Sequence, residues 1–239
     1  ILRSVEEQGM LTPEMKESFE KASSLTELED LYLPYKPKKR TRATIARDKG
    51  IETLAVIVMN QQEKSVMRKA EEFLSEEVKN CEDALQGARD IIAEWVNENQ
   101  EARITLRQQF SAGAVIYSKI IKGKNQEGIK YRDYFESSEP LKRCPSHRLL
   151  AVFRGEEEGF LRIAIEPDEE NALAALGRIF VKGSGEASRQ VEKAIKDSYK
   201  RLLHPSIENE FRALSKERAD DEAIRVFAEN LKQLLLAPP

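Results

Sequence analysis

Signals for helix boundaries recur along almost the whole chain, and they constrain the fold more than any other feature of the sequence. The segment Thr12-Pro13-Glu14 combines a capping hydroxyl, a first-turn proline and an acidic side chain, which together predict a helix start. Residues 83–97 gather their apolar side chains on one face, as amphipathic helices do. Comparable patterns predict helices over residues 26–33, 41–50, 51–59, 61–75, 101–110, 131–135, 146–153, 171–180, 187–203, 206–214 and 220–236.

Two short segments depart from this helical pattern. Residues 115–121 are rich in β-branched side chains, and residues 160–165 begin with apolar and polar side chains in alternation. Both patterns are typical of short strands. We therefore expect a mainly α protein, a multi-helix scaffold with a helix-turn-helix-like module and a small two- or three-stranded β element.

The chain of 239 residues has room for one large or two modest domains. We expect an N-terminal helical region over residues 1–80 and a helix-turn-helix-like module with short strands over residues 81–165. A further helical segment is expected over residues 166–239. Both ends have the character of a cut chain, because Ile1 is no initiator methionine and the last residues are unusually apolar.

The segment 28–50, here called the basic strap, concentrates positive charge in a stiff stretch of chain. Pro34 and Pro37 punctuate this stretch, and we expect them to hold Tyr35 and Lys36 in an extended rather than a helical conformation. Two interpretations remain open: the strap faces phosphates, or it is structural, with Tyr32 and Tyr35 packed on a helix and the charges in water. The basic side chains of the strap are Lys36, Lys38, Lys39, Arg40, Arg42, Arg47 and Lys49.

Any contact with nucleic acid must be local, because the formal net charge of the whole chain is −3. A second basic group begins in the segment 115–121 and continues beyond it, with aromatic side chains interleaved; its members are Lys119, Lys122, Lys124, Lys130, Arg132, Arg143 and Arg148. One interpretation is a helix-turn-helix-like module that presents a basic helix. The other, which is the more common arrangement, is a core of aromatic side chains surrounded by solvated cations.

The sequence offers little support for catalysis. Its two histidines, His147 and His204, both lie at predicted helix ends, and no group of His, Cys, Asp and Glu has the spacing of metal ligands. Cys81 and Cys144 are isolated, which indicates free thiols in a reducing compartment. No apolar run is long enough to cross a membrane. We expect a cytoplasmic protein that is not an enzyme and that has no catalytic residues, metal or cofactor.

Four ordered motifs carry a resemblance to a known family. They are LEDLYLPYKPKKRTRATIARDKG, ALQGARDIIAEWVNEN, KYRDYFESSEPLKRCPSHRLLAVFRGEEEGFL and AIRVFAENLKQLLLAPP, and they are spread over nearly the whole chain. Together they resemble the Tex family of bacterial transcription accessory proteins. The resemblance implies a longer protein in which an RNase-H-like domain, helix-hairpin-helix elements and a C-terminal OB-fold RNA-binding domain follow this segment.

The resemblance implies a nucleic-acid-associated role in transcription, with the transcription machinery as a possible class of partner and most of the affinity in the C-terminal domains. Within this segment we expect a non-enzymatic scaffold that makes weak, sequence-independent phosphate contacts. The alternative is a protein-interaction scaffold whose strap is structural and binds no nucleic acid. The predicted nucleic-acid-binding residues are Lys36, Lys38, Lys39, Arg40, Arg42, Arg47, Lys130, Arg132 and Arg148.

Overall fold

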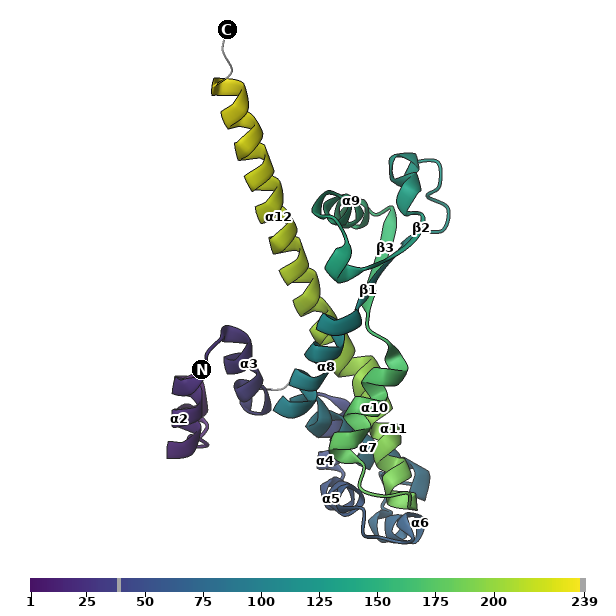
Figure 1. The fold of residues 1–239 in the computed structure, drawn as a ribbon. Helices are drawn as coiled ribbons and strands as arrows, with labels where there is room; N and C mark the ends of the chain where they lie inside the picture. The colour runs from purple at the N-terminus through teal and green to yellow at the C-terminus, as the bar shows by residue number, and fades with distance from the viewer. Residues whose placement is uncertain (38–39, 237–239) are drawn as a thin grey trace. The chain divides into compact units, whose positions relative to one another are not determined.

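The computed structural model describes residues 1–37 and 40–236. These residues form twelve α-helices and one three-stranded antiparallel sheet, so the prediction of a mainly α fold with a small β element is confirmed (Figure 1). The chain divides into two compact units. Unit 1 contains Ile1–Leu106 and Leu173–His204, and unit 2 contains Arg107–Ala172 and Pro205–Pro239.

Unit 1 is entirely helical in its described part. Its elements are α1 (Leu2–Glu7), α2 (Pro13–Lys21), α3 (Leu25–Tyr32), η1 (Leu33–Tyr35), α4 (Arg42–Asp48), α5 (Glu52–Asn60), α6 (Val66–Ala70), η2 (Glu71–Phe73), α7 (Cys81–Glu98), the start of α8 (Gln100–Gly113), the end of α10 (Glu169–Phe180), α11 (Glu186–Ser198) and the π-helical turn η5 (Tyr199–Leu203).

Helix α7 is the centre of unit 1. It contacts α4, α5, α6 and α11, and its side chains Leu85, Ile91 and Ile92 are almost completely buried. Gly87 permits the close approach of α4 and α5, because a Cβ at this position would lie 3.3 Å from side-chain atoms of both Ala46 and Ile51. Burial of this apolar surface is the main stabilising contribution to the unit.

Several polar side chains that are buried within unit 1 have partners on neighbouring elements. The Arg89 guanidinium donates to Gln190 Oε1 on α11 at 2.6 Å, and the Ser198 hydroxyl donates to the carbonyl of Ala93 at 2.7 Å. Asp30 on α3 accepts from Arg103 Nε at 2.5 Å, and both of these side chains are more than nine-tenths buried. Removing one member of such a buried ion pair typically costs about 3–5 kcal/mol.

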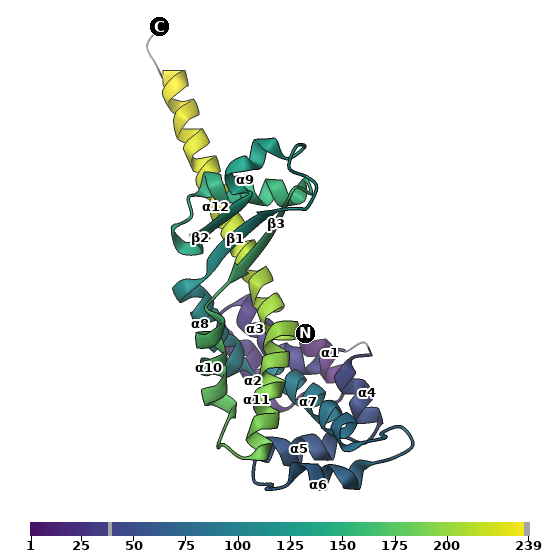
Figure 2. The ribbon, with the colours of Figure 1, turned by 90° about the vertical axis from the view of Figure 1, so that its right-hand side faces the viewer.

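Unit 2 is built around the sheet, whose strand order is β2-β1-β3 (Figure 2). Helix α9 packs on the buried face of this sheet, against β3. The elements of the unit are the end of α8, β1 (Val115–Ile120), η3 (Ile129–Tyr134), β2 (Glu136–Pro140), η4 (Leu141–Arg143), α9 (Ser146–Glu157), β3 (Leu161–Glu166), the start of α10, and α12 (His204–Leu236) after its first residue.

Helix α12 is fastened to β3 and α9 by polar contacts. Arg212 donates from Nη1 to Glu156 Oε2 at 2.6 Å and from Nη2 to the carbonyl of Ile163 at 2.8 Å. Glu208 accepts from the backbone N–H of Ile165 at 2.9 Å. These contacts satisfy backbone groups on an edge strand, which would otherwise remain open to pairing with another chain.

Several predicted boundaries are wrong in informative ways. Helices 206–214 and 220–236 are one continuous α12, because the intervening residues Ser215–Ala219 are mostly good helix formers. The predicted helix 61–75 is reduced to α6 and η2, and the helix predicted at 131–135 is the 3₁₀-helix η3. Residues 131–135 thus lie mostly in a 3₁₀-helix and not in the α-helix that we predicted there.

The helices begin with different caps. Thr12 accepts from the backbone N–H of Met15, as expected for a helix cap. The cap of α3 is Ser24, which accepts from the N–H of Glu27, so this helix begins at Leu25. The N-cap of α9 is Pro145, which offers no side-chain cap, and the hydroxyl of Ser146 bonds to Glu222 of α12.

We predict that Gly155→Ala destabilises unit 2 by about 1–3 kcal/mol, as overpacking of a core does. A Cβ at this position in α9 would lie 2.5 Å from Cδ1 of the buried Leu161. Denaturant unfolding followed by circular dichroism measures the free-energy change.

Gly177→Ala in α10 is the matched control for this substitution. It is also a helical glycine, but its added Cβ meets no described atom within 4 Å. It should be neutral or stabilising by up to about 1 kcal/mol, because alanine has the higher helix propensity. Equal destabilisation by the two variants would contradict the proposed clash with Leu161.

Candidate nucleic-acid interface

The described part of the basic strap runs from the end of α3 through η1 to α4. Thr41 caps α4 in a reciprocal arrangement: its Oγ1 accepts from the N–H of Thr44 at 3.1 Å, and Thr44 Oγ1 accepts from the N–H of Thr41 at 2.7 Å. The chain therefore enters α4 in a fixed direction immediately after Arg40.

Glu94 of α7 holds both ends of α4. Its Oε1 accepts from Arg47 Nη1 at 2.6 Å, and its Oε2 accepts from the Thr41 hydroxyl at 3.2 Å. The Glu94 side chain is 9% exposed, so these bonds lie in a poorly solvated environment. Arg47 also bonds through Nε to Glu52 of α5 at 3.2 Å. The two contacts of Glu94 fasten the C-terminal part of the strap to the core of unit 1.

The other described cations of the strap that we predicted to bind are placed differently from Arg47. Lys36, Arg40 and Arg42 are exposed, and within the described residues no carboxylate forms an ion pair with any of them. Lys38 and Lys39 lie outside the described residues. Among the described strap cations that we predicted to bind, one guanidinium is thus anchored and three cations face solvent.

The tyrosines at the start of the strap are half-buried. The hydroxyl groups of Tyr32 and Ser4 are hydrogen-bonded at 3.0 Å, which connects the end of α3 to α1. Tyr35 is also half-buried, but it lies in the 3₁₀-helix η1, so the expectation that it is extended is wrong, whereas Lys36 is extended as expected. These positions agree with the packing role that the structural interpretation gave to both side chains.

A pocket of about 190 Å³ lies between the strap and α7, with Lys36, Thr41, Asp90 and Glu94 among its lining residues. Burial raises the pKa of Asp90 above its ordinary value, although a hydrogen bond from Gln86 and the charge of Arg201 act in the opposite direction. Arg201 Nη2 lies 3.8 Å from Asp90 Oδ1, so this attraction is weak. The wall of the pocket formed by α7 is therefore acidic.

The second basic group lies in unit 2, and two of its three predicted binding residues are ion-paired. Lys130 Nζ is 2.5 Å from Glu158 Oε2, and Arg148 Nη2 is 2.5 Å from Glu139 Oε1. Arg132 is exposed and has no ion pair within the described chain. Among these three residues, Arg132 is thus the one whose guanidinium no described carboxylate neutralises.

The side chains considered for catalysis are arranged as ordinary structural groups. The ring of His204 packs against Tyr199 with 5.3 Å between centroids, and His147 is exposed at the start of α9. Burial raises the pKa of the Cys144 thiol to about 11, which keeps it protonated and unreactive. Within residues 1–37 and 40–236, no group of three His, Cys, Asp or Glu side chains is placed to hold a metal ion.

Sequence reasoning missed Glu94, which decides how the strap is attached. A signal was present, because Asp90 and Glu94 are carboxylates one turn apart that flank the apolar run Ile91-Ile92-Ala93 of an amphipathic helix. Carboxylates on such a face need a partner, since burying an unpaired charge is costly. The sequence does not indicate which cation supplies that partner.

The pKa of Asp90 leads to a prediction about pH. Because the folded-state pKa is raised, the charged carboxylate costs stability above that pKa, and the cost is relieved as the pH falls through it toward the unfolded value. Asp90→Asn should therefore raise the free energy of unfolding near neutral pH, and this gain should vanish below the ordinary carboxyl value of 3.8. Urea unfolding at a series of pH values measures the difference.

Asp197→Asn is the control, because Asp197 forms its own ion pair with Arg201 at 2.6 Å. This variant should show no stabilisation near neutral pH. If Asp90→Asn instead destabilised the protein near neutral pH, attraction by Arg201 would outweigh the burial of Asp90.

Within the described residues, no helix is long and apolar enough to cross a membrane. The sequence profile described as "Tex central region-like" matches residues 61–227. The chain is also 39% identical to "Transcriptional accessory protein Tex" of Neisseria gonorrhoeae, over all of this chain and 32% of that protein.

Two further relatives cover the whole chain. A Bacillus subtilis protein named YdcI is 38% identical, with 34% of its length matched, and the human "S1 RNA-binding domain-containing protein 1" is 24% identical, with 25% matched. The chain thus spans about a third of the length of the bacterial relatives. Because the profile covers most of the chain and includes α7, the sheet and most of α12, the chain belongs to the Tex family.

Proposed function

We propose that this segment is a non-enzymatic scaffold of a nucleic-acid-associated transcription accessory protein. In this proposal the basic strap makes weak, sequence-independent contacts with phosphates. The names of two relatives, one a transcriptional accessory protein and one containing an S1 RNA-binding domain, support the class of partner. The transcription machinery is the corresponding class of protein partner.

One observation supports the strap as the contact surface. Arg40 and Arg42 are exposed on either side of Thr41, the residue whose hydroxyl is bonded to Glu94. The two cations thus extend from a fixed point of unit 1. A guanidinium that is held at its base and open at its tip can bind a phosphate with little further loss of backbone entropy.

The individual strap residues have different roles in this proposal. Lys36, Arg40 and Arg42 contact phosphates, together with Lys38 and Lys39 from outside the described residues. Arg47 holds α4 against α7 through Glu94 and positions the strap. Arg132 is the member of the second group that is available for a further phosphate contact, because Lys130 and Arg148 have carboxylate partners.

The alternative function is a protein-interaction scaffold in which the strap is structural and binds no nucleic acid. The ion pair of Arg47 with Glu94 and the hydrogen bond of Tyr32 to Ser4 favour this alternative, because both side chains are used internally. The two proposals differ on whether Arg40 and Arg42 contribute to affinity for polyanions.

Charge reversal at Arg40 and Arg42 tests the proposed function. Arg40→Glu with Arg42→Glu should weaken the binding of two duplexes of unrelated sequence by the same factor. The slope of log K against log salt should become less steep by about 0.9 for each lost contact. Fluorescence anisotropy of labelled duplexes over a range of salt concentrations measures both quantities.

The matched control reverses Lys64 and Arg68, two exposed cations of unit 1 outside the strap. It changes the net charge by the same amount and should leave the slope nearly unchanged. Equal effects of the two double variants would mean that only net charge matters, and no effect of the strap variant would favour the structural alternative.

A further inference from the structure

The sheet of unit 2 has one face that α9 and α12 leave open. Burial alternates along β1, where Ile116 and Ser118 are buried while Tyr117 and Lys119 are exposed. The same alternation along β3 exposes Arg162. The open face is therefore formed by three strands, which lie side by side in the order β2-β1-β3 (Figure 2).

The register of the strands places a tyrosine in the middle of this face. Tyr117 lies on the central strand β1, opposite Ser138 of β2 and opposite Ala164 of β3. Both lateral neighbours have small side chains that cannot cover an aromatic ring. Tyr117 is 38% exposed, so a large flat side chain is accessible at the centre of the sheet.

The next row of the same face carries two cations side by side. Lys119 pairs in register with Arg162, so two positive side chains lie directly across neighbouring strands. Like charges in this position repel each other and destabilise the sheet. In the described part of the chain neither cation forms an ion pair within 4 Å. An anion bound between them would relieve the repulsion.

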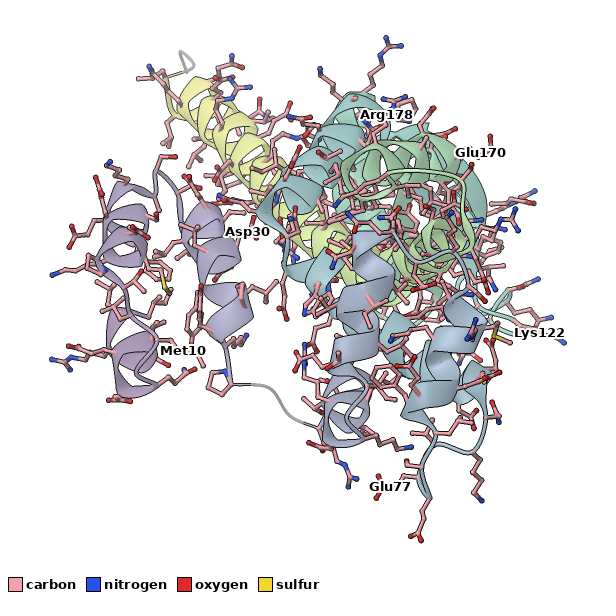
Figure 3. All side chains as sticks on the ribbon, turned by 90° about the horizontal axis from the view of Figure 1, so that it is seen from below. Met10, Asp30, Glu77, Lys122, Glu170 and Arg178 are labelled. Carbon is pink, nitrogen blue, oxygen red and sulfur yellow. The ribbon has the colours of Figure 1, made fainter. Side chains whose placement is uncertain are left out.

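The charge on this face is distributed unevenly. Lys122 follows β1 in the turn beyond Lys119 and is exposed (Figure 3). Glu166 lies at the other end of the face, in the row of Val115. Glu136 lies beside Lys119 on β2 without forming an ion pair to it within the described residues. One end of the face is thus suited to a phosphate, and the centre is suited to a flat ring.

We propose that the open face of the β2-β1-β3 sheet binds single-stranded nucleic acid, with a base stacked on Tyr117 and the adjacent phosphate held by Lys119 and Arg162. An aromatic side chain on an open sheet is a general solution for binding unpaired bases, because every base has a π-face. A duplex keeps its base faces stacked, so Tyr117 should contribute nothing to duplex binding. This site shares its ligand class with the proposed function but none of its residues.

Substitution of Tyr117 by residues with and without a ring tests the stacking. Tyr117→Leu should weaken the binding of a labelled 12-mer of oligouridine at least about five-fold, which is the lower end of the usual effect of losing one stacked base. Tyr117→Phe keeps the ring and should change the affinity less than about two-fold. Neither variant should change the affinity for a duplex of the same length.

The cations are tested separately from the ring. Lys119→Gln with Arg162→Gln should make the salt slope for oligouridine less steep by about 0.7 per contact. Lys142→Gln with Arg143→Gln is the matched control, because these are exposed cations of unit 2 in η4, outside the sheet. If thermal melting shows that Tyr117→Leu does not fold, the cation variants still test the proposal.

The outcomes separate this site from the strap. Loss of oligouridine binding in Tyr117→Leu but not in Tyr117→Phe supports the sheet site, whatever the strap variant does. Unchanged affinity in Tyr117→Leu, equal loss in both Tyr117 variants, or equal slopes for the two double-Gln variants overturns it. In those cases the open face would instead be a surface for a protein partner. The result for the Arg40 and Arg42 variant does not depend on these outcomes.

Discussion

Because α7 is largely buried, the other elements of unit 1 must supply partners for its charged side chains. A helix that contacts α4, α5, α6 and α11 has little of its surface left for solvent, yet α7 contains Arg89, Asp90 and Glu94. Each of these groups needs a matching partner, because uncompensated charge in a protein interior is strongly destabilising. Arg89 forms an ion pair with Glu82 and also donates to Gln190, and Glu94 forms an ion pair with Arg47. The position of the strap is therefore a consequence of how the central helix satisfies its charges.

The need of buried Glu94 for a partner also distinguishes Arg47 from the exposed cations of the strap. Sequence alone shows a run of positive side chains, but it does not show that one of them is neutralised by a carboxylate 47 positions away, as Arg47 is by Glu94. Exposed surface ion pairs contribute little to stability, whereas a pair with one largely buried member can fix a conformation. Because Glu94 holds Arg47, α4 is fixed against α7, while Arg40 and Arg42 near its start are exposed to solvent.

Local signals predicted much of the fold, and the errors have identifiable physical causes. The cap at Thr12, the amphipathic α7 and the strands β1 and β3 were all predicted by their own residues. Strand β2 was missed because Glu136–Pro140 contains no β-branched residue and is extended only through its pairing with β1. The open face of the sheet could not be predicted, because the pairing of Lys119 with Arg162 depends on strand register.

Unit 1 is formed by two segments that are far apart in the sequence, and this affects how the chain folds. The amide of Gln61 donates to the carbonyl of Phe180 at 2.7 Å, and its oxygen accepts from the N–H of Lys182 at 2.8 Å. During synthesis on a ribosome, α7 emerges well before α11, which buries one of its sides, and the whole sheet of unit 2 is made in between. Until α11 has been synthesised, the apolar surface of unit 1 that it covers stays exposed. Such exposed surface promotes chaperone binding or aggregation.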